Sequence, residues 1–135
     1  MTLHVEVVSP ERILWTGEAD RVIARTLGGG EIAFLTGHAP FVGALDIGTV
    51  RVHSEDGNEE TIAVHGGFVE VSHDRVTVLS DVAEVASQID VDRARAAAER
   101  AETSLRVEHD VEVDAALRRA RVRIEAATGS VGASH

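Results

Sequence analysis

The residues from Gly28 to Pro40, GGGEIAFLTGHAP, are the stretch whose residue types and spacing come closest to a site of chemistry. Three consecutive glycines can cradle a phosphate with their backbone N–H groups, and His38 can serve as a general base. The neighbouring sequence supports neither use, because no Walker lysine, no GxGxxG pattern and no GxSxG nucleophile elbow accompanies them. We therefore predict a glycine-rich turn or bulge, followed by a tight turn in which the imidazole of His38 bonds the backbone.

The other histidines and the basic residues exclude further kinds of site. None of the seven histidines forms an HxH, HxxxH or HExxH pair, so no metal site is expected. The run HGG at residues 65–67 resembles part of a lipase oxyanion loop but has no serine to serve, and we interpret it as a turn. All 13 basic residues are arginines, which excludes lysine-based catalysis, and the absence of cysteine excludes thiolate chemistry.

Charge and hydropathy restrict the partners. A net charge of −10 excludes nucleic acid, because neutralising phosphates needs a basic surface, and it suits a basic protein partner. The longest run without a charged residue, 32–45, is broken by glycines and falls short of the ~20 apolar residues that span a bilayer. No secretory signal is visible at the N-terminus. We expect no direct membrane insertion, only residence in the cytosol or attachment to a membrane through partners.

The chain changes character near residue 86. Ten of the 12 glycines lie before residue 68, and residues 1–86 carry 14 acids against five arginines. Residues 87–135 carry nine acids against eight arginines and hold 11 alanines. We predict an N-terminal β-sandwich over 1–86 and a C-terminal two-helix hairpin with a short frayed tail over 87–135.

The first part has the period of half-buried strands. LHVEVV at residues 3–8 alternates apolar and polar side chains, and six similar runs follow with turn residues between them. Six to ten strands without a helix-length segment predict an all-β sandwich or flattened barrel. SEDGN at residues 54–58 holds an Asp-Gly pair, so a hairpin should join the strands on either side of it.

The second part has the period of helices. Apolar positions recur at spacings of three and four along two seams: Val91, Ala94, Ala98, Ala101 and Leu105, then Val113, Leu117, Ala120, Ile124 and Ala127. Asp90 precedes the first helix as an N-cap should. Acidic and basic residues four apart, Asp114 with Arg118 and Arg121 with Glu125, predict ion pairs along one helix. Because an alanine seam buries little area, the hairpin should be marginal unless it packs on something else.

Three stretches in this order resemble one known family. GEIAFLTGHAPFVGALDIGTVRV (30–52), VHGGFVEVSHDRVTVLSD (64–81) and the alanine–arginine hairpin are similar to the epsilon subunit of bacterial F-type ATP synthase. The resemblance runs from about residue 3 to residue 127 and implies a ten-stranded β-sandwich followed by two helices.

The resemblance implies a non-catalytic subunit of the central rotor stalk. Such a subunit binds the gamma subunit and rests its sandwich on the c-ring. It thereby couples proton-driven rotation to ATP synthesis in the alpha/beta catalytic head. The resemblance also implies a peripheral position on the cytoplasmic face of the cell membrane. It further implies a hairpin that restrains ATP hydrolysis when it extends into the head. Gly30, Glu31 and His38 would then belong to the c-ring-facing end of the sandwich.

Some members of the family also bind ATP as a regulatory ligand, through an [IL]-D-x-x-R-A motif. IDVDRA at residues 89–94 matches it, and the implied ATP-binding residues are Glu84, Ile89, Asp90, Arg93, Ala94, Arg119 and Arg123. Asp92 departs from the pattern by adding negative charge near the phosphates, and no other cofactor is implied. The alternative interpretation is an unrelated adaptor, a β-sandwich carrying a coiled-coil arm. A free-standing hydrolase is excluded because no nucleophile is assembled.

Overall fold

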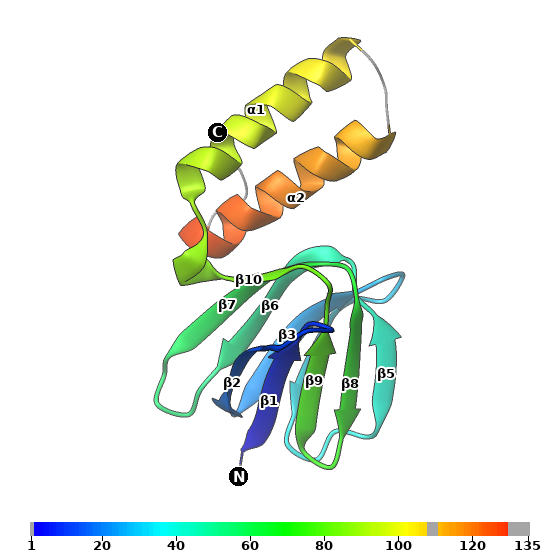
Figure 1. The fold of residues 1–135 in the computed structure, drawn as a ribbon. Coiled ribbons are helices and arrows are strands. Elements are labelled where there is room, and N and C mark those ends of the chain that lie inside the picture. Colours follow the sequence, from blue (N-terminus) through cyan, green and yellow to red (C-terminus); the bar gives the residue numbers. More distant parts are fainter. Residues whose placement is uncertain (1, 108–110, 130–135) are drawn as a thin grey trace.

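Ten strands in two stacked sheets form a β-sandwich, and a two-helix hairpin lies across one end of it (Figure 1). The computed structural model describes residues 2–107 and 111–129. The strands are β1 (Leu3–Val8), β2 (Ile13–Ala19), β3 (Arg21–Thr26), β4 (Gly30–Leu35), β5 (Phe41–Ala44), β6 (Ile47–His53), β7 (Glu59–His65), β8 (Phe68–Ser72), β9 (Arg75–Leu79) and β10 (Ala83–Val85). The predicted fold class is confirmed.

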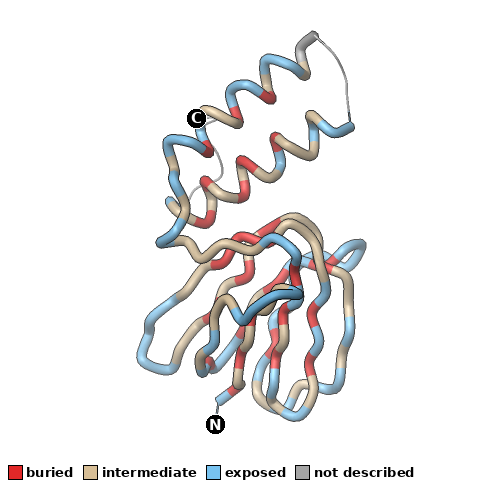
Figure 2. The backbone as a smooth tube through the Cα atoms, in the orientation of Figure 1, coloured by how far each residue is buried: buried red, intermediate tan, exposed pale blue. Residues whose placement is uncertain are grey.

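The two sheets have the orders β2-β1-β9-β8-β5 and β10-β7-β6-β3-β4. Neighbouring strands are antiparallel except β1 and β9, which run parallel. Each strand turns alternate side chains inward, so the two inner faces meet in one apolar core, drawn as the red segments of Figure 2. Leu3, Phe34 and Ile62 are the largest side chains in that core, and valines fill most of the rest.

Alternation of apolar and polar residues in the sequence does not identify three of the strands, β2, β5 and β10. In β2 the pairing with β1 shifts register after Val7, so its apolar positions do not alternate cleanly. The strand β5 has four residues, one of them Gly43, and β10 has three. Strands this short carry too few residues to establish a period of two.

The glycine-rich turns form as the sequence indicates. Gly28 and Gly30 have positive φ in the β3–β4 turn. At Gly67, between β7 and β8, φ is +114° and any side chain would run into the carbonyl oxygen of Leu79. The HGG run is therefore a turn that lets two strands approach closely. The Asp-Gly hairpin is also confirmed, since residues 54–58 join β6 to β7.

The helices α1 (Val91–Val107) and α2 (Val111–Thr128) pack along the predicted seam. Ala94, Ala98 and Ala101 are buried against Leu117, Ala120 and Ile124. Asp90 caps α1, its Oδ1 accepting a hydrogen bond from the Arg93 N–H at 3.1 Å, as predicted. Two predicted members, Val91 and Ala127, are only partly buried and do not belong to the seam. Next to Ala127, Ala126 turns toward the sandwich instead.

Residues 83–88 connect the sandwich to the hairpin as ordered structure. The strand β10 pairs with β7, and a single 3-10 turn, η1 (Ala86–Gln88), follows it. The sequence-based boundary between residues 86 and 87 falls inside that turn.

We predict that residues 1–86 fold without the hairpin. Every buried residue of the main sandwich core comes from the strands or the turns between them, so removing residues 87–135 opens only a small apolar patch. Circular dichroism of the truncated chain should show β-structure that is lost in one cooperative thermal transition. A truncated chain without such a transition would mean that the sandwich needs the helices.

Candidate functional site

His38 lies in a tight turn beyond the end of β4. Its backbone N–H donates to the Leu35 carbonyl at 3.0 Å, and its Nδ1–H donates to the Ala39 carbonyl at 2.7 Å. The imidazole also meets the ring of Phe34 edge-on, with the centroids 5.0 Å apart. Both features are those of a turn histidine, as the sequence predicts.

The structure separates His38 from the other two residues of the implied c-ring-facing end. Gly30 begins β4, whereas His38 follows its last residue, so the length of the strand, roughly 20 Å, lies between them. Glu31 accepts hydrogen bonds from Arg51 at 2.8 Å and Arg25 at 3.5 Å, on the outer surface of the sheet and close to α2. Gly30 and Glu31 therefore lie near one end of β4 and His38 beyond the other, so a partner that contacts all three would have to span the length of the strand.

The helix α2 holds the hairpin on the sandwich through a small apolar contact. Val122 and Ala126 cover Ala63 of β7, and partly buried Ile47 and Ile89 lie at the margins. These two α2 residues point away from the helix–helix seam, so α2 has apolar side chains on two faces. Sequence periodicity identified the first face only, because two residues are too few to form a second stripe.

Two ion pairs flank this apolar contact. Arg118 Nη2 lies 2.6 Å from Asp46 Oδ1, and Arg123 Nε lies 2.6 Å from Glu84 Oε1. Each pair joins α2 to the sandwich, and each side chain is between about a quarter and a half exposed. Pairs that reach water this freely contribute about 1 kcal/mol or less.

These contacts correct the expectation that charged residues four apart form ion pairs along α2. Arg118 pairs with Asp46 rather than with Asp114 four residues earlier, and Arg121 pairs with Glu102 on α1 at 3.0 Å. The like-charged residues Arg119 and Arg123 also have acidic partners, since Arg119 reaches Glu112 at 3.1 Å. Ion pairs between different elements depend on tertiary packing, and the spacing of residues along one helix does not predict that packing.

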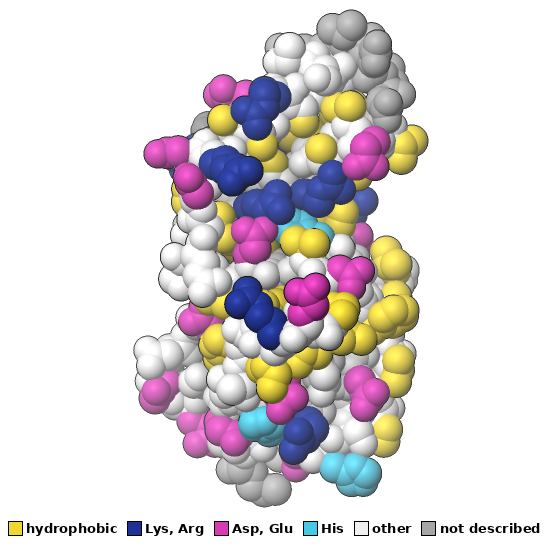
Figure 3. Space-filling model, in the orientation of Figure 1, with side chains coloured by type: hydrophobic (Ala, Val, Ile, Leu, Met, Phe, Trp, Pro, Cys, Tyr) yellow, Lys and Arg dark blue, Asp and Glu magenta, His cyan; other side chains and the backbone are white. Residues whose placement is uncertain are grey.

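A groove of about 400 Å³ opens where the two helices meet the linker. Its lining includes six of the seven residues that the ATP motif implies: Glu84, Ile89, Asp90, Arg93, Ala94 and Arg123. The seventh, Arg119, does not line it. Arg100 of α1 does, although the motif does not name it. Figure 3 shows arginine side chains gathered on the hairpin just above the sandwich, so the groove is rich in anion-binding groups.

The outer face of the β1-β2-β5-β8-β9 sheet is divided into an apolar and a polar part. Ala44, Phe68, Leu79 and Val8 are register partners in one row across four strands at the end near the helices. Phe68 is 55% exposed and Leu79 45%. Hydrophobic side chains are gathered along this edge of the molecule in Figure 3. The row is a solvent-exposed apolar surface of the kind that partners cover.

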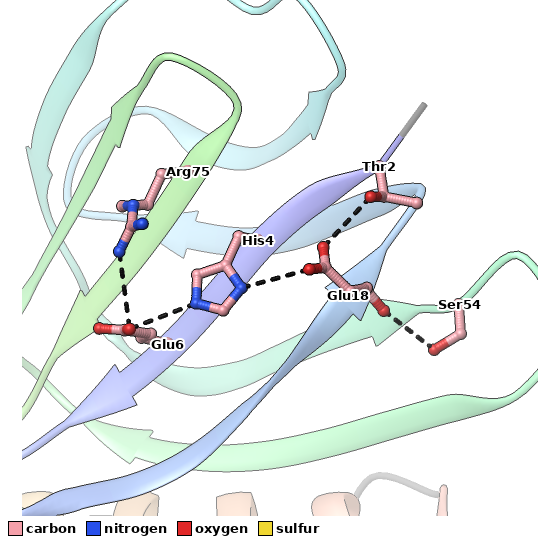
Figure 4. A network of polar contacts seen from close by, with 6 residues as sticks. All are labelled: Thr2, His4, Glu6, Glu18, Ser54 and Arg75. Atoms are coloured by element: carbon pink, nitrogen blue, oxygen red, sulfur yellow. Dashed lines mark hydrogen bonds and ion pairs between the residues drawn. The ribbon is translucent and has the colours of Figure 1, made fainter.

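The other end of the same face carries a polar network, drawn in Figure 4. His4 lies between the carboxylates of Glu6 and Glu18, at 3.3 and 3.4 Å, and Arg75 approaches Glu6 at 3.6 Å. The exposed fractions of its charged side chains run from 25% for Glu6 to 61% for Glu18, and these side chains bind one another, so the network is a surface cluster rather than an assembled active site.

Within residues 2–107 and 111–129, no group of three or more His, Asp or Glu residues is placed to hold a metal ion. Neither α1 nor α2, as far as they are described, is long and apolar enough to cross a membrane.

Solved structures match this fold. The chain superposes on a chain of the mitochondrial ATP synthase of Euglena gracilis, in its OSCP/F1/c-ring assembly, with a TM-score of 0.68 and 21% identity, covering 92% of this chain and 76% of that one. A second match, from the central stalk/c-ring of the Tetrahymena thermophila mitochondrial ATP synthase, has a TM-score of 0.56 and 13% identity over 95% and 98% of the two chains. At these identities the likeness shows the fold alone.

Comparison of the sequences identifies the family. Residues 2–86 match the family model described as the ATP synthase Delta/Epsilon chain β-sandwich domain. An ATP synthase epsilon chain from Thermobifida fusca is 48% identical over 128 residues, covering 93% of this chain and 91% of the relative. Another, from Streptomyces griseus, is 42% identical over 124 residues, or 92% and 94% of the two chains. Since these matches include the hairpin as well as the sandwich, the chain belongs to the family of ATP synthase epsilon chains.

Proposed function

We propose that this chain, a non-catalytic subunit of the ATP synthase central stalk, couples proton-driven rotation to ATP synthesis and restrains ATP hydrolysis through its hairpin. In this role it binds the gamma subunit, the c-ring and the alpha/beta catalytic head, and it lies at the cytoplasmic face of the membrane as a peripheral component. Family membership excludes the alternative, an unrelated adaptor module.

The observation that carries the regulatory part is the small contact between hairpin and sandwich. Two small apolar side chains and two half-exposed ion pairs hold α2 in place, while the sandwich core is complete without them. An element held this weakly can leave its site at a cost of a few kcal/mol, the range in which partners shift conformational equilibria. The docked hairpin is then the state that permits hydrolysis, and the released hairpin is the state that restrains it.

Two surfaces of the sandwich fit the stalk partners. The apolar row with Phe68 and Leu79 crosses four strands, and we assign it to the gamma subunit. The β3–β4 turn projects from the sandwich with Leu27 61% exposed beside Gly30 and Glu31, and we assign that turn to the c-ring. His38 is not part of this assignment, since it lies at the other end of β4.

Removing and releasing the hairpin should change hydrolysis in opposite directions. Deleting residues 87–135 should raise the ATPase activity of the membrane complex, because no inhibitory element remains. Val122→Asp places a carboxylate against Ala63, which should weaken docking by about 3 kcal/mol or more and lower ATPase activity. Val111→Asp, at a position 87% exposed at the start of α2, is the matched control and should change little. Equal ATPase rates for all four complexes would contradict the regulatory proposal.

The groove between the helices supports regulation by a nucleotide. Arg93 and Arg100 of α1 and Arg123 of α2 converge on it, and guanidinium groups bind phosphates through charge-assisted hydrogen bonds. Asp90 uses its carboxylate as the α1 cap, so its part in the motif is to fix the helix start beside the groove. We propose that ATP binds here and favours the docked hairpin.

Titration calorimetry of the whole chain with ATP tests this site. Arg123→Ala should weaken binding by roughly ten- to a hundredfold, the effect of losing one charge-assisted hydrogen bond of ~1.5–3 kcal/mol. Arg121→Ala is the matched control, because Arg121 lies on the same helix, pairs with Glu102 and does not line the groove. Saturable binding that is equally weakened by both substitutions, or no binding at millimolar ATP, would exclude the groove as the ATP site.

His38→Ala distinguishes a structural histidine from a general base. The substitution removes one hydrogen bond to Ala39 and a ring contact with Phe34, so thermal unfolding should show a loss of roughly 1 kcal/mol. Assembled complexes should still synthesise ATP at near the original rate, whereas loss of a general base costs ~10²–10⁴ in rate. A fall of that size with the fold intact would contradict the structural interpretation.

A further inference from the structure

The imidazole of His65, the last residue of β7, is buried without a hydrogen-bond partner. Its side chain is 3% exposed, and neither ring nitrogen has a hydrogen-bond partner in the structure. The closest acceptor, Glu84 Oε1, is 3.5 Å from Nε2 and is already held by Arg123 at 2.6 Å. A buried polar group left without a partner costs free energy, so its position calls for a physical reason.

Three charged groups face the imidazole from the elements packed around it. Arg123 and Arg119 lie on α2, and Glu84 lies on β10. Burial lowers the pKa of His65 below its usual 6.5, the guanidinium of Arg123 lowers it further, and the carboxylate of Glu84 opposes both. Arg119 adds a smaller lowering effect. The imidazole is therefore neutral at neutral pH while the hairpin is docked.

Release of the hairpin removes the effects that lower the pKa of His65. Arg119 and Arg123 are residues of α2 and leave with it, and so does the cover that α2 gives to the end of β7, whereas Glu84 stays with the sandwich. In the released state His65 is exposed to water beside a carboxylate, which favours the charged imidazolium. Protonation and docking therefore compete.

We infer that His65 is a proton-sensitive latch, which holds the hairpin on the sandwich when neutral and releases it when protonated. This inference rests on the proposed release of the hairpin and adds the signal that controls it. Acidification of the surrounding solution thereby favours the state in which hydrolysis is restrained.

The direction and size of the effect follow from proton linkage. Well above the pKa of the released imidazole neither state binds the proton, so docking is at full strength and independent of pH. As the pH falls below 6.5, the released state takes up the proton and the docked state does not, so docking weakens. One proton changes the docking equilibrium by at most about tenfold per pH unit, or about tenfold between pH 7.5 and 5.5.

Among residues 2–107 and 111–129, His4, His38, His53 and His73 lie on other strands or turns, outside the apolar contact under α2.

The first test measures the linkage directly by NMR titration of the His65 ring in the full-length chain. The pKa of His65 should lie below 6.5 in the unchanged protein and should rise in Val122→Asp, in which α2 is released. Energy transfer from Trp15, the single tryptophan, to an acceptor on Ser104→Cys in α1 reports docking in the same samples, because the chain has no cysteine of its own. A released hairpin with an unchanged His65 pKa would overturn the latch but leave hairpin release intact. A hairpin that stays docked in Val122→Asp would instead contradict the proposed release.

The second test compares docking at pH 7.5 and 5.5 by the same energy transfer. Acid should reduce docking in the unchanged chain by up to about tenfold. It should leave docking unchanged in His65→Gln, which keeps a neutral polar side chain. His73→Asn is the control, because His73 is exposed in the β8–β9 turn at a positive φ that asparagine tolerates, and it should respond to acid as the unchanged chain does. An acid response that persists in His65→Gln would assign the proton to another group and overturn the inference.

Discussion

The contact between α2 and the outer face of β7 is the interaction on which the regulatory architecture depends. Val122 and Ala126 of α2 meet Ala63, and no larger apolar side chain is buried between hairpin and sandwich among the described residues. The helix has to serve two surfaces at once, because its other face packs against α1. Dividing one helix between two partners leaves little apolar area for either, so neither contact is strong.

The alanines of the hairpin suit this arrangement. They allow α1 and α2 to approach closely, and they remove little surface from water when they do so. Half-exposed ion pairs such as Arg118–Asp46 then fix the position of α2 without adding much free energy, because water competes for both groups. The sandwich is built in the opposite way, with Phe34 and a set of branched aliphatic side chains fully enclosed between two sheets. The sizes of the buried side chains thus distinguish a tightly packed sandwich from a weakly held hairpin.

The fold could be predicted from the sequence because apolar residues recur with a different period in each of the two parts. Alternation in runs such as residues 3–8 identified the sandwich, and spacings of three and four identified both helices and most of their seam. The strands β2, β5 and β10 were missed because a register shift, a glycine and short length remove the period. The apolar character of the docking face was missed for a similar reason, since Val122 and Ala126 alone form no pattern.

The candidate sites were less predictable, because they depend on distances between elements. The motif at residues 89–94 located most of the groove, but Arg100 and the exclusion of Arg119 required the packing of α1 on α2. Gly30 and His38 are close in sequence and far apart in the sandwich, because a strand lies between them. The partners of Arg118 and Arg123 are 72 and 39 residues away, a separation that no local spacing rule reaches.

Arg123 connects the two proposed signals, since it lines the groove and also binds Glu84 beside His65. The groove is complete only while Glu84, Arg93 and Arg123 meet, which requires both the closed hairpin and the docked α2. A ligand there gains its full set of contacts in the docked state alone, and so it stabilises docking by the difference in its affinity for the two states. A proton on His65 acts in the opposite direction on the same equilibrium. Nucleotide and acid would therefore antagonise each other through the docking equilibrium of α2, without any contact between the two ligands.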